Sequence, residues 1–160
     1  MIIIVTGSVG SGKTTISKEL AGKLKAKYLD VNNFIKDNKL RGKYIKKLDT
    51  YEVDVKKLVK LLIKVIKNSK NSLVIDSHLS HYIPKIYVDY CVVCECDLKV
   101  LKKRLKERSY SDVKIKENLD SQIFDVCKIE AIEEGHNLIV IDTTRDNVNK
   151  CVKKIIKLVL

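Results

Sequence analysis

Short apolar runs alternate along the chain with longer segments in which apolar residues recur every three or four positions. Continuous apolar runs are typical of strands buried on both faces, and the 3.6-residue period is typical of amphipathic helices. The runs predict strands at residues 1–6, 26–31, 72–76, 90–96 and 138–141. The periodic segments predict helices at 14–25, 54–68, 98–108 and 113–134, and a last helix capped by Asp146.

This alternation predicts an α/β fold with three layers, in which helices cover both faces of a five-stranded parallel sheet. The 160 residues are enough for a single domain spanning residues 1–160. Two segments interrupt the alternation. Residues 32–50 are polar and irregular, and residues 109–112 break the helical pattern.

A glycine-rich loop follows the first predicted strand. Residues 7–14, GSVGSGKT, fit the pattern G-x-x-x-x-G-K-[ST] in full, with a strand before the loop and a helix after it. Glycines allow the tight turn that gathers backbone N–H groups around a phosphate. Lys13 is expected to reach the β- and γ-phosphates of a nucleoside triphosphate, and Thr14 to bind Mg²⁺.

A carboxylate, Asp76, ends the third predicted strand, SLVID. It is expected at the carboxyl edge of the sheet, where ligands bind, as a Mg²⁺ partner acting through water or as a base. His78 follows and is expected near the γ-phosphate, as a hydrogen-bonding group or a proton acceptor. A metal site formed by His78 and His81 lacks a nearby third ligand.

Arg104 and Arg108 lie one helical turn apart, just before the polar break. Guanidinium groups neutralise the charge of a transferred phosphoryl group, which favours a hinged lid over the nucleotide. The alternative is a solvated helix face, as for most charged pairs. The chain has only four arginines. The presence of two of them at one place favours the lid over the solvated helix face.

The net charge is +12, supplied almost entirely by lysine. It fits either RNA contact or the composition of an AT-rich or heat-adapted genome, and the sequence displays no aromatic platform for bases. The opening MIIIV is too short for a membrane span and lacks signal-peptide features, so a cytoplasmic protein is expected. Cys91, Cys94 and Cys96 alternate across a predicted strand, which favours buried thiols over zinc.

Among proteins with such a loop, the chain lacks the N-K-x-D and D-x-x-G motifs of a GTPase and is too short for a motor or transporter ATPase. A small-molecule kinase remains. An acceptor-binding insertion is expected at about 31–54, and a lid at about 108–120.

The chain also resembles a known family over nearly its whole length. It looks like the adenylate kinase isoenzyme 6 family, also called Fap7 or CINAP, in its archaeal form. The resemblance rests on the GSVGSGKTT loop, Tyr28, Leu48-Asp49, the D-x-H of Asp76 and His78, the segment ERSY with KIKENLDSQI, and the triplet at 142–144.

This resemblance implies a broad-specificity nucleoside monophosphate kinase that converts ATP and AMP to two ADP with Mg²⁺. It also implies ATP hydrolysis linked to maturation of the small ribosomal subunit, with a small-subunit ribosomal protein as partner and rRNA as a further contact. A monomer is expected. The residues implied to bind ATP are Gly10, Ser11, Gly12, Lys13, Thr14, Thr15 and Arg108, with Asp76 and His78 organising metal and water.

The acceptor half departs from the family pattern. Asn32 and Asn33 stand where a Gly-Asp is usual, and Lys36 replaces an expected arginine, so Asn33 and Lys36 become the expected AMP contacts. A lysine cannot form a bidentate fork on a phosphate. Two alternatives therefore stay open: an ATP-dependent assembly factor with little AMP kinase activity, and a kinase for another acceptor such as cytidylate.

Overall fold

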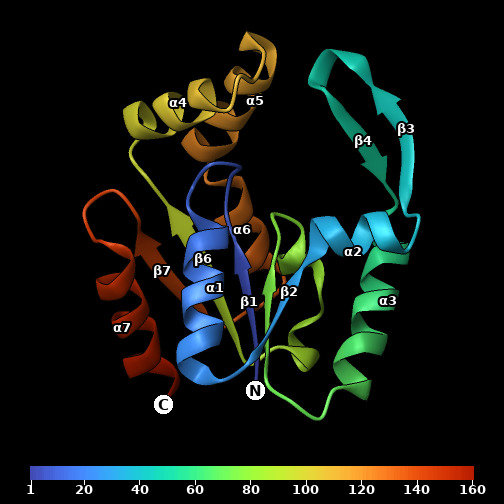
Figure 1. Ribbon diagram of the computed structural model, residues 1–160, viewed down its shortest axis with the longest axis vertical. Helices are drawn as coiled ribbons and strands as arrows, with labels where there is room; N and C mark the ends of the chain where they lie inside the picture. Colours follow the sequence, from blue (N-terminus) through green and yellow to red (C-terminus); the bar gives the residue numbers. More distant parts are fainter.

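The computed structural model describes residues 1–160 and contains a five-stranded sheet in the order β2-β5-β1-β6-β7. All neighbouring strands in it are parallel. Figure 1 shows the strands fanned through the centre of the molecule with the carboxyl ends pointing to one edge. The strands are β1 (Ile2–Thr6), β2 (Lys27–Asp30), β5 (Leu73–Asp76), β6 (Tyr90–Glu95) and β7 (Leu138–Asp142).

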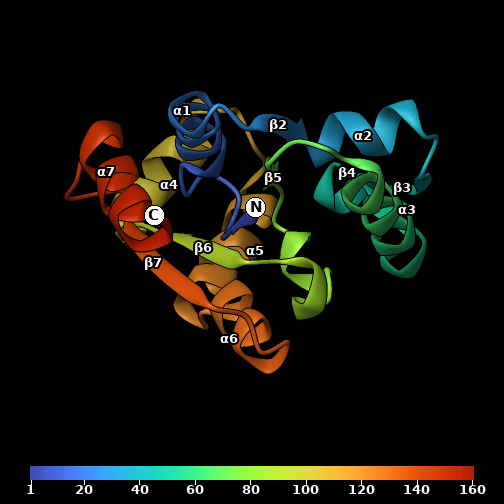
Figure 2. The same cartoon turned by 90° about the horizontal axis from the view of Figure 1, so that it is seen from below.

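Helices cover both faces of this sheet, as Figure 2 shows from below. One face carries α1 (Lys13–Leu24) and α7 (Val148–Val159), which share one core cluster with the strands. The other face carries α2 (Val31–Asp37), α3 (Val55–Asn68) and α6 (Val126–Glu133), which share the second cluster. The predicted three-layer fold is therefore confirmed.

Side chains alternate across the sheet, which explains why the strands read as continuous apolar runs. In β1, Ile4 packs in the α3 layer, whereas Ile3 and Val5 pack in the α1 layer. In β6, Cys91 and Cys94 fall on opposite faces in the same way. The two thiols of the C-x-x-C therefore cannot converge on one ion.

The polar segment after β2 is more regular than its sequence suggests. Helix α2 begins there because the Asp30 side chain accepts hydrogen bonds from the N–H groups of Asn32 and Asn33. An antiparallel hairpin follows, with β3 (Arg41–Ile45), the short 3₁₀ turn η1 (Lys46–Leu48) and β4 (Thr50–Val53). The interpretation of 32–50 as irregular was wrong, because a hairpin outside the core leaves no alternation of buried and exposed residues.

Helix α4 (Leu98–Glu107) and helix α5 (Asp112–Ile123) form the segment above the phosphate loop and share a small core around Leu101 and Leu105. The single helix predicted at 113–134 is wrong. It is two helices, because Asp125 adopts a left-handed conformation with φ 49° and ends the pattern between α5 and α6. The predicted cap of α7 is also wrong: Asn147 caps the helix.

None of the helices combines the length and the apolar composition that crossing a membrane requires.

Leu62 of α3 is fully buried, whereas Leu158 of α7 is 60% exposed. We expect Leu62→Ala to lower the free energy of unfolding by about 2–5 kcal/mol, because it leaves a cavity in the core. Leu158→Ala is the matched control and should change it by less than about 0.5 kcal/mol. Chemical denaturation measures both values, and equal effects would contradict the packing described here.

Candidate active site

The phosphate loop between β1 and α1 presents backbone N–H groups that no protein atom accepts from. The N–H groups of Gly10, Gly12, Lys13, Thr14 and Thr15 have no acceptor, although these residues all line one cavity. Gly10 and Gly12 hold φ of 89° and 94°, which gathers these groups before the N-terminus of α1. Such a concavity fits an anion, and a phosphate in particular.

Lys13 is the buried cation of this loop. Its Nζ donates to the carbonyl of Ser8 at 2.8 Å, and burial lowers the pKa of the ammonium group. The neighbouring Asp76 opposes this shift. A buried ammonium with one carbonyl partner gains strongly from a phosphate, which supplies the missing negative charge.

Asp76 ends β5 directly beside this loop. Its Oδ2 accepts hydrogen bonds from the hydroxyl groups of Thr14 at 2.6 Å and Tyr28 at 3.0 Å. The strand register explains the contact, because β5 lies between β1 and β2. One hydroxyl and one carboxylate beside a phosphate cradle are a donor set that suits Mg²⁺, which takes few protein ligands and several phosphate or water oxygens.

The structure separates the two histidines of the D-S-H-L-S-H segment. His78 reaches water in the cavity, where burial by the surrounding walls and the charge of Lys13 lower its pKa to about 4. His81 lies within the protein and contacts Thr6 Oγ1 and Glu130 Oε2, both at 2.8 Å. His78 thus belongs to the site as a neutral imidazole, whereas His81 braces the end of β1.

The two arginines of α4 differ in their partners. Arg104 donates to the carbonyls of Gly10 and Thr143 and to the Thr143 hydroxyl, each at 3.2 Å. The Arg108 side chain makes no hydrogen bond or ion pair with the protein and lines two adjoining cavities. Arg104 therefore positions the phosphate loop, and Arg108 is free to contact a ligand.

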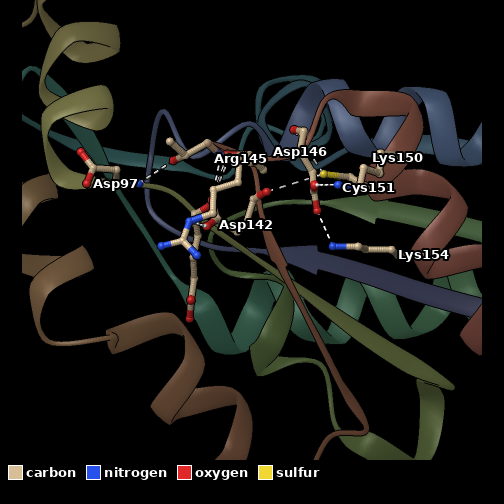
Figure 3. Close-up of polar contacts among 10 residues, drawn as sticks. Asp97, Asp142, Arg145, Asp146, Lys150, Cys151 and Lys154 are labelled. Atoms are coloured by element: carbon tan, nitrogen blue, oxygen red, sulfur yellow. Dashed lines mark hydrogen bonds and ion pairs between the residues drawn. The ribbon is translucent and has the colours of Figure 1, made fainter.

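The loop after β7 lies beside the phosphate loop, and Figure 3 shows its polar contacts with α7. The Asp146 carboxylate forms ion pairs with Lys150, at 2.6 Å, and with Lys154. These lysines lower the pKa of the Asp146 carboxyl group. The Cys151 thiol donates to the backbone carbonyls of Asp142 and Asp146. These contacts hold the loop against α7. On its other side, the Thr143 hydroxyl of this loop donates to the Ser11 carbonyl of the phosphate loop at 2.7 Å.

Three cavities meet around these groups. A central one of about 470 Å³ holds Lys13, Asp76 and His78. A second, of about 380 Å³, lies between the phosphate loop, α4 and the loop after β7, and shares Arg108 with the first. A third, of about 360 Å³, lies between α2 and the β3–β4 hairpin. It shares Asn32, Thr50 and His78 with the central cavity, so the central cavity adjoins both of the others.

The structure brings most predicted site residues together, with exceptions. Gly10, Gly12, Thr14 and Thr15 line the central cavity, whereas the Ser11 side chain is fully buried and lines none of the three. Asn33 and Lys36 line none of them either. Sequence reasoning gave no site role to several residues that line these cavities or hold Asp76: Tyr28, Asn32, Arg41, Thr50, Tyr110, Lys114, Asn118 and Thr143.

Tyr28 and the segments that contain Tyr110, Lys114, Asn118 and Thr143 carried one signal, as parts of the family resemblance. Their place at the cavities depends on the fold, because they come from separate elements; the contact of Tyr28 with Asp76, for example, depends on the strand order.

The chain is similar in sequence to proteins with assigned names. A family model described as an AAA domain matches residues 3–125. A protein named "Putative adenylate kinase" from Pyrococcus furiosus is 38% identical over 159 residues, which cover 99% of this chain and 84% of that protein. The yeast "Adenylate kinase isoenzyme 6 homolog FAP7" from Saccharomyces cerevisiae is 34% identical over 158 residues, covering 98% and 79%. This chain belongs to the adenylate kinase isoenzyme 6 family.

Solved structures agree on the fold of this adenylate kinase isoenzyme 6 family member. Shikimate kinase from Bacteroides thetaiotaomicron matches with a TM-score of 0.67 at 16% identity, covering 99% of this chain and 98% of that one. YorR from Bacillus subtilis, in complex with phosphorylated GDP, matches at 0.65 and 18%, covering 99% and 95%. The chain is therefore a nucleotide kinase-like protein with a P-loop fold.

His78 should stay neutral down to a pH of about 4, because its pKa lies below the usual value for histidine. An NMR titration of the His78 ring should therefore have its midpoint near 4. Between pH 6.5 and 4 the unfolded chain binds a proton at this position that the folded chain does not. The free energy of unfolding therefore decreases as the pH is lowered through this range. His78→Asn should reduce that fall.

Lys13→Ala serves as the matched test, since it removes one cause of the low pKa and should raise the His78 midpoint. A midpoint at 6.5 or above in the unmodified protein contradicts this description of the cavity.

Proposed function

We propose that this protein is an adenylate kinase that transfers the γ-phosphoryl group of ATP to AMP in the presence of Mg²⁺. The three adjoining cavities carry the proposal, because they offer room for a phosphate chain in the central cavity and for a nucleoside on either side of it. The unpartnered N–H groups of the phosphate loop lie on the central cavity, where the reacting phosphates would meet.

Five side chains of the central cavity have a task in this reaction. Lys13 and Arg108 neutralise the charge that spreads over the transferred group, and the loop N–H groups hold the donor phosphates. Thr14 and Asp76 are the residues that would hold Mg²⁺, which, when bound, offsets charge on the phosphate oxygens. The neutral His78 provides a hydrogen-bonding group at the junction with the acceptor cavity.

The reaction breaks the bond between the γ-phosphorus and its bridging oxygen, and forms one to an α-phosphate oxygen of AMP. One ATP and one AMP therefore become two ADP. Water in the acceptor position would give ATP hydrolysis by the same route, so both activities can share one site. Catalysis then rests on positioning and charge neutralisation rather than on a covalent intermediate.

A second candidate function is an ATP-dependent assembly factor for the small ribosomal subunit, which binds a ribosomal protein or rRNA. One observation favours it. Although the chain carries a charge of +12, residues 120–134 contain five acidic residues and one lysine. Within this segment Phe124 and Ile132 are 67% and 56% exposed. Exposed apolar side chains among acids suit a basic protein partner.

Lys13→Ala should lower the rate of AMP-dependent ADP formation by about a hundredfold or more, since it removes the buried cation of the phosphate site. A coupled assay with ATP, AMP and Mg²⁺ measures this rate. Lys23→Ala is the matched control: Lys23 lies on the same helix, is 58% exposed and should keep full activity.

The same assay separates the two candidate functions. ADP formation that does not require AMP, cytidylate or another monophosphate rules out the kinase. Hydrolysis stimulated by a purified small-subunit protein would instead support the assembly factor, and failure to bind any small-subunit component would count against it.

The acceptor cavity is lined by Arg41 and Asn32, whereas Lys36 and Asn33 lie outside it. We therefore expect Arg41→Ala to raise the KM for AMP about tenfold or more with a smaller change in kcat. Lys36→Ala, which removes the same charge nearby, should change the KM by less than about twofold. A larger rise in the KM for AMP with Lys36→Ala than with Arg41→Ala would contradict this prediction. It would support Asn33 and Lys36, the residues expected from the sequence, as the AMP contacts.

A further inference from the structure

The β3–β4 hairpin is the most exposed element of the molecule. It projects from the body of the protein beside α5 (Figure 1). Within residues 41–53 no residue is fully buried, and only Ile45, Leu48 and Val53 are less than about one third exposed. Such a hairpin contributes little to the core, so its exposed side chains are free to contact a ligand.

Two tyrosines meet on this hairpin. Tyr44 and Tyr51 are opposite each other across the two strands, with ring centroids 5.1 Å apart, and they are 45% and 43% exposed. The Arg41 guanidinium lies 4.8 Å from the centre of the Tyr51 ring. The Tyr44 hydroxyl donates to Asp49 at 2.6 Å, which fixes the ring. The sequence showed no aromatic platform, because these rings are seven residues apart and only the hairpin unites them.

The same hairpin is rich in unpaired cations. Arg41, Lys43, Lys46 and Lys47 are exposed, and none of them forms an ion pair with a carboxylate. One of the two acids on the hairpin, Asp49, is engaged by Tyr44. Exposed aromatic faces among free cations combine the two features that hold nucleic acid: base stacking and phosphate attraction.

We propose that the β3–β4 hairpin binds single-stranded nucleic acid. Bases stack on the exposed faces of Tyr44 and Tyr51, while Lys43, Lys46 and Lys47 hold the phosphates. Unpaired strands are favoured over duplexes, because paired bases are already stacked on each other and cannot reach the rings. Stacking without base-edge hydrogen bonds predicts weak sequence preference.

This inference deepens the second candidate function, since it assigns the nucleic-acid contact to one element, and it requires no step of the phosphoryl transfer. Tyr44, Lys46 and Lys47 line none of the three cavities, whereas Tyr51 and Arg41 line the acceptor cavity. Variants at the first three positions therefore test nucleic-acid binding separately from nucleotide binding.

The test is fluorescence anisotropy of the full chain with a labelled single-stranded oligouridylate, which cannot pair with itself. Tyr44→Ala should weaken binding about tenfold or more, because one stacking face is lost. Tyr44→Phe keeps the ring without the hydroxyl and should bind within about twofold of the unmodified protein. Thermal unfolding of each variant checks that the hairpin change leaves the fold intact.

A matched pair of double variants separates local contact from general charge. The double variant Lys46→Ala with Lys47→Ala should weaken binding. It should also reduce the slope of log affinity against log salt concentration by about one phosphate contact or more. Lys153→Ala with Lys157→Ala removes the same charge from exposed positions of α7, on the far side of the molecule in Figure 1, and should have a smaller effect.

Equal losses in the two double variants, no loss in Tyr44→Ala, no measurable binding, or equal affinity for a duplex of the same length would each overturn the proposal. If Tyr44→Ala loses oligouridylate binding while neither the unmodified protein nor any variant forms ADP from ATP and AMP, the kinase proposal fails and the hairpin proposal stands. If ADP formation is normal and oligouridylate does not bind, the reverse holds.

Discussion

The hydrogen bond from Thr14 to Asp76 joins the phosphate loop to the neighbouring strand, and the site is organised around it. It exists because β1 and β5 are adjacent and parallel, with Val5 paired to Asp76, so that both strands end at the same edge. A parallel sheet places the carboxyl ends of its strands together, and helix N-termini follow them there. One strand register thus brings the candidate metal ligands, the phosphate cradle and Lys13 together.

The phosphate loop is braced on every side, which keeps its free N–H groups in place. Arg104 and Thr143 hold it from α4 and the loop after β7, Ser8 donates to Gln122 of α5 at 2.8 Å, and His81 holds Thr6 at the end of β1. A cradle fixed before the ligand arrives needs little reorganisation when phosphate binds. Arg108, without protein partners, is by contrast free to follow the ligand.

The hairpin and α5 enclose the central cavity from two separate segments of the chain. Lys114 of α5 donates to the Asp49 carbonyl at the hairpin turn at 3.0 Å and lies 4.1 Å from the centre of the Tyr110 ring. This contact joins α5 to the β3–β4 hairpin. Because the hairpin also carries exposed rings and cations, one structural element forms both this outer surface and a wall of the cavity beside α2.

The amino-acid sequence by itself determined the five strands, the helices α1, α3 and α7, and the phosphate loop. These features depend on local chemistry: apolar periodicity, and glycines that permit positive φ at positions 10 and 12. The sequence also identified Asp76, because a carboxylate that ends an apolar strand is visible without the fold.

The tertiary structure alone decided which distant residues face the ligand. Arg104 and Arg108 look alike in sequence, but only one of them is satisfied by carbonyls of Gly10 and Thr143. The hairpin was missed because it lies outside the core and its sequence carries no burial pattern. Asn32 rather than Asn33 lines the cavity between α2 and the hairpin because of the rotation of α2 about its axis. Such choices depend on strand order and helix rotation, which local patterns do not encode.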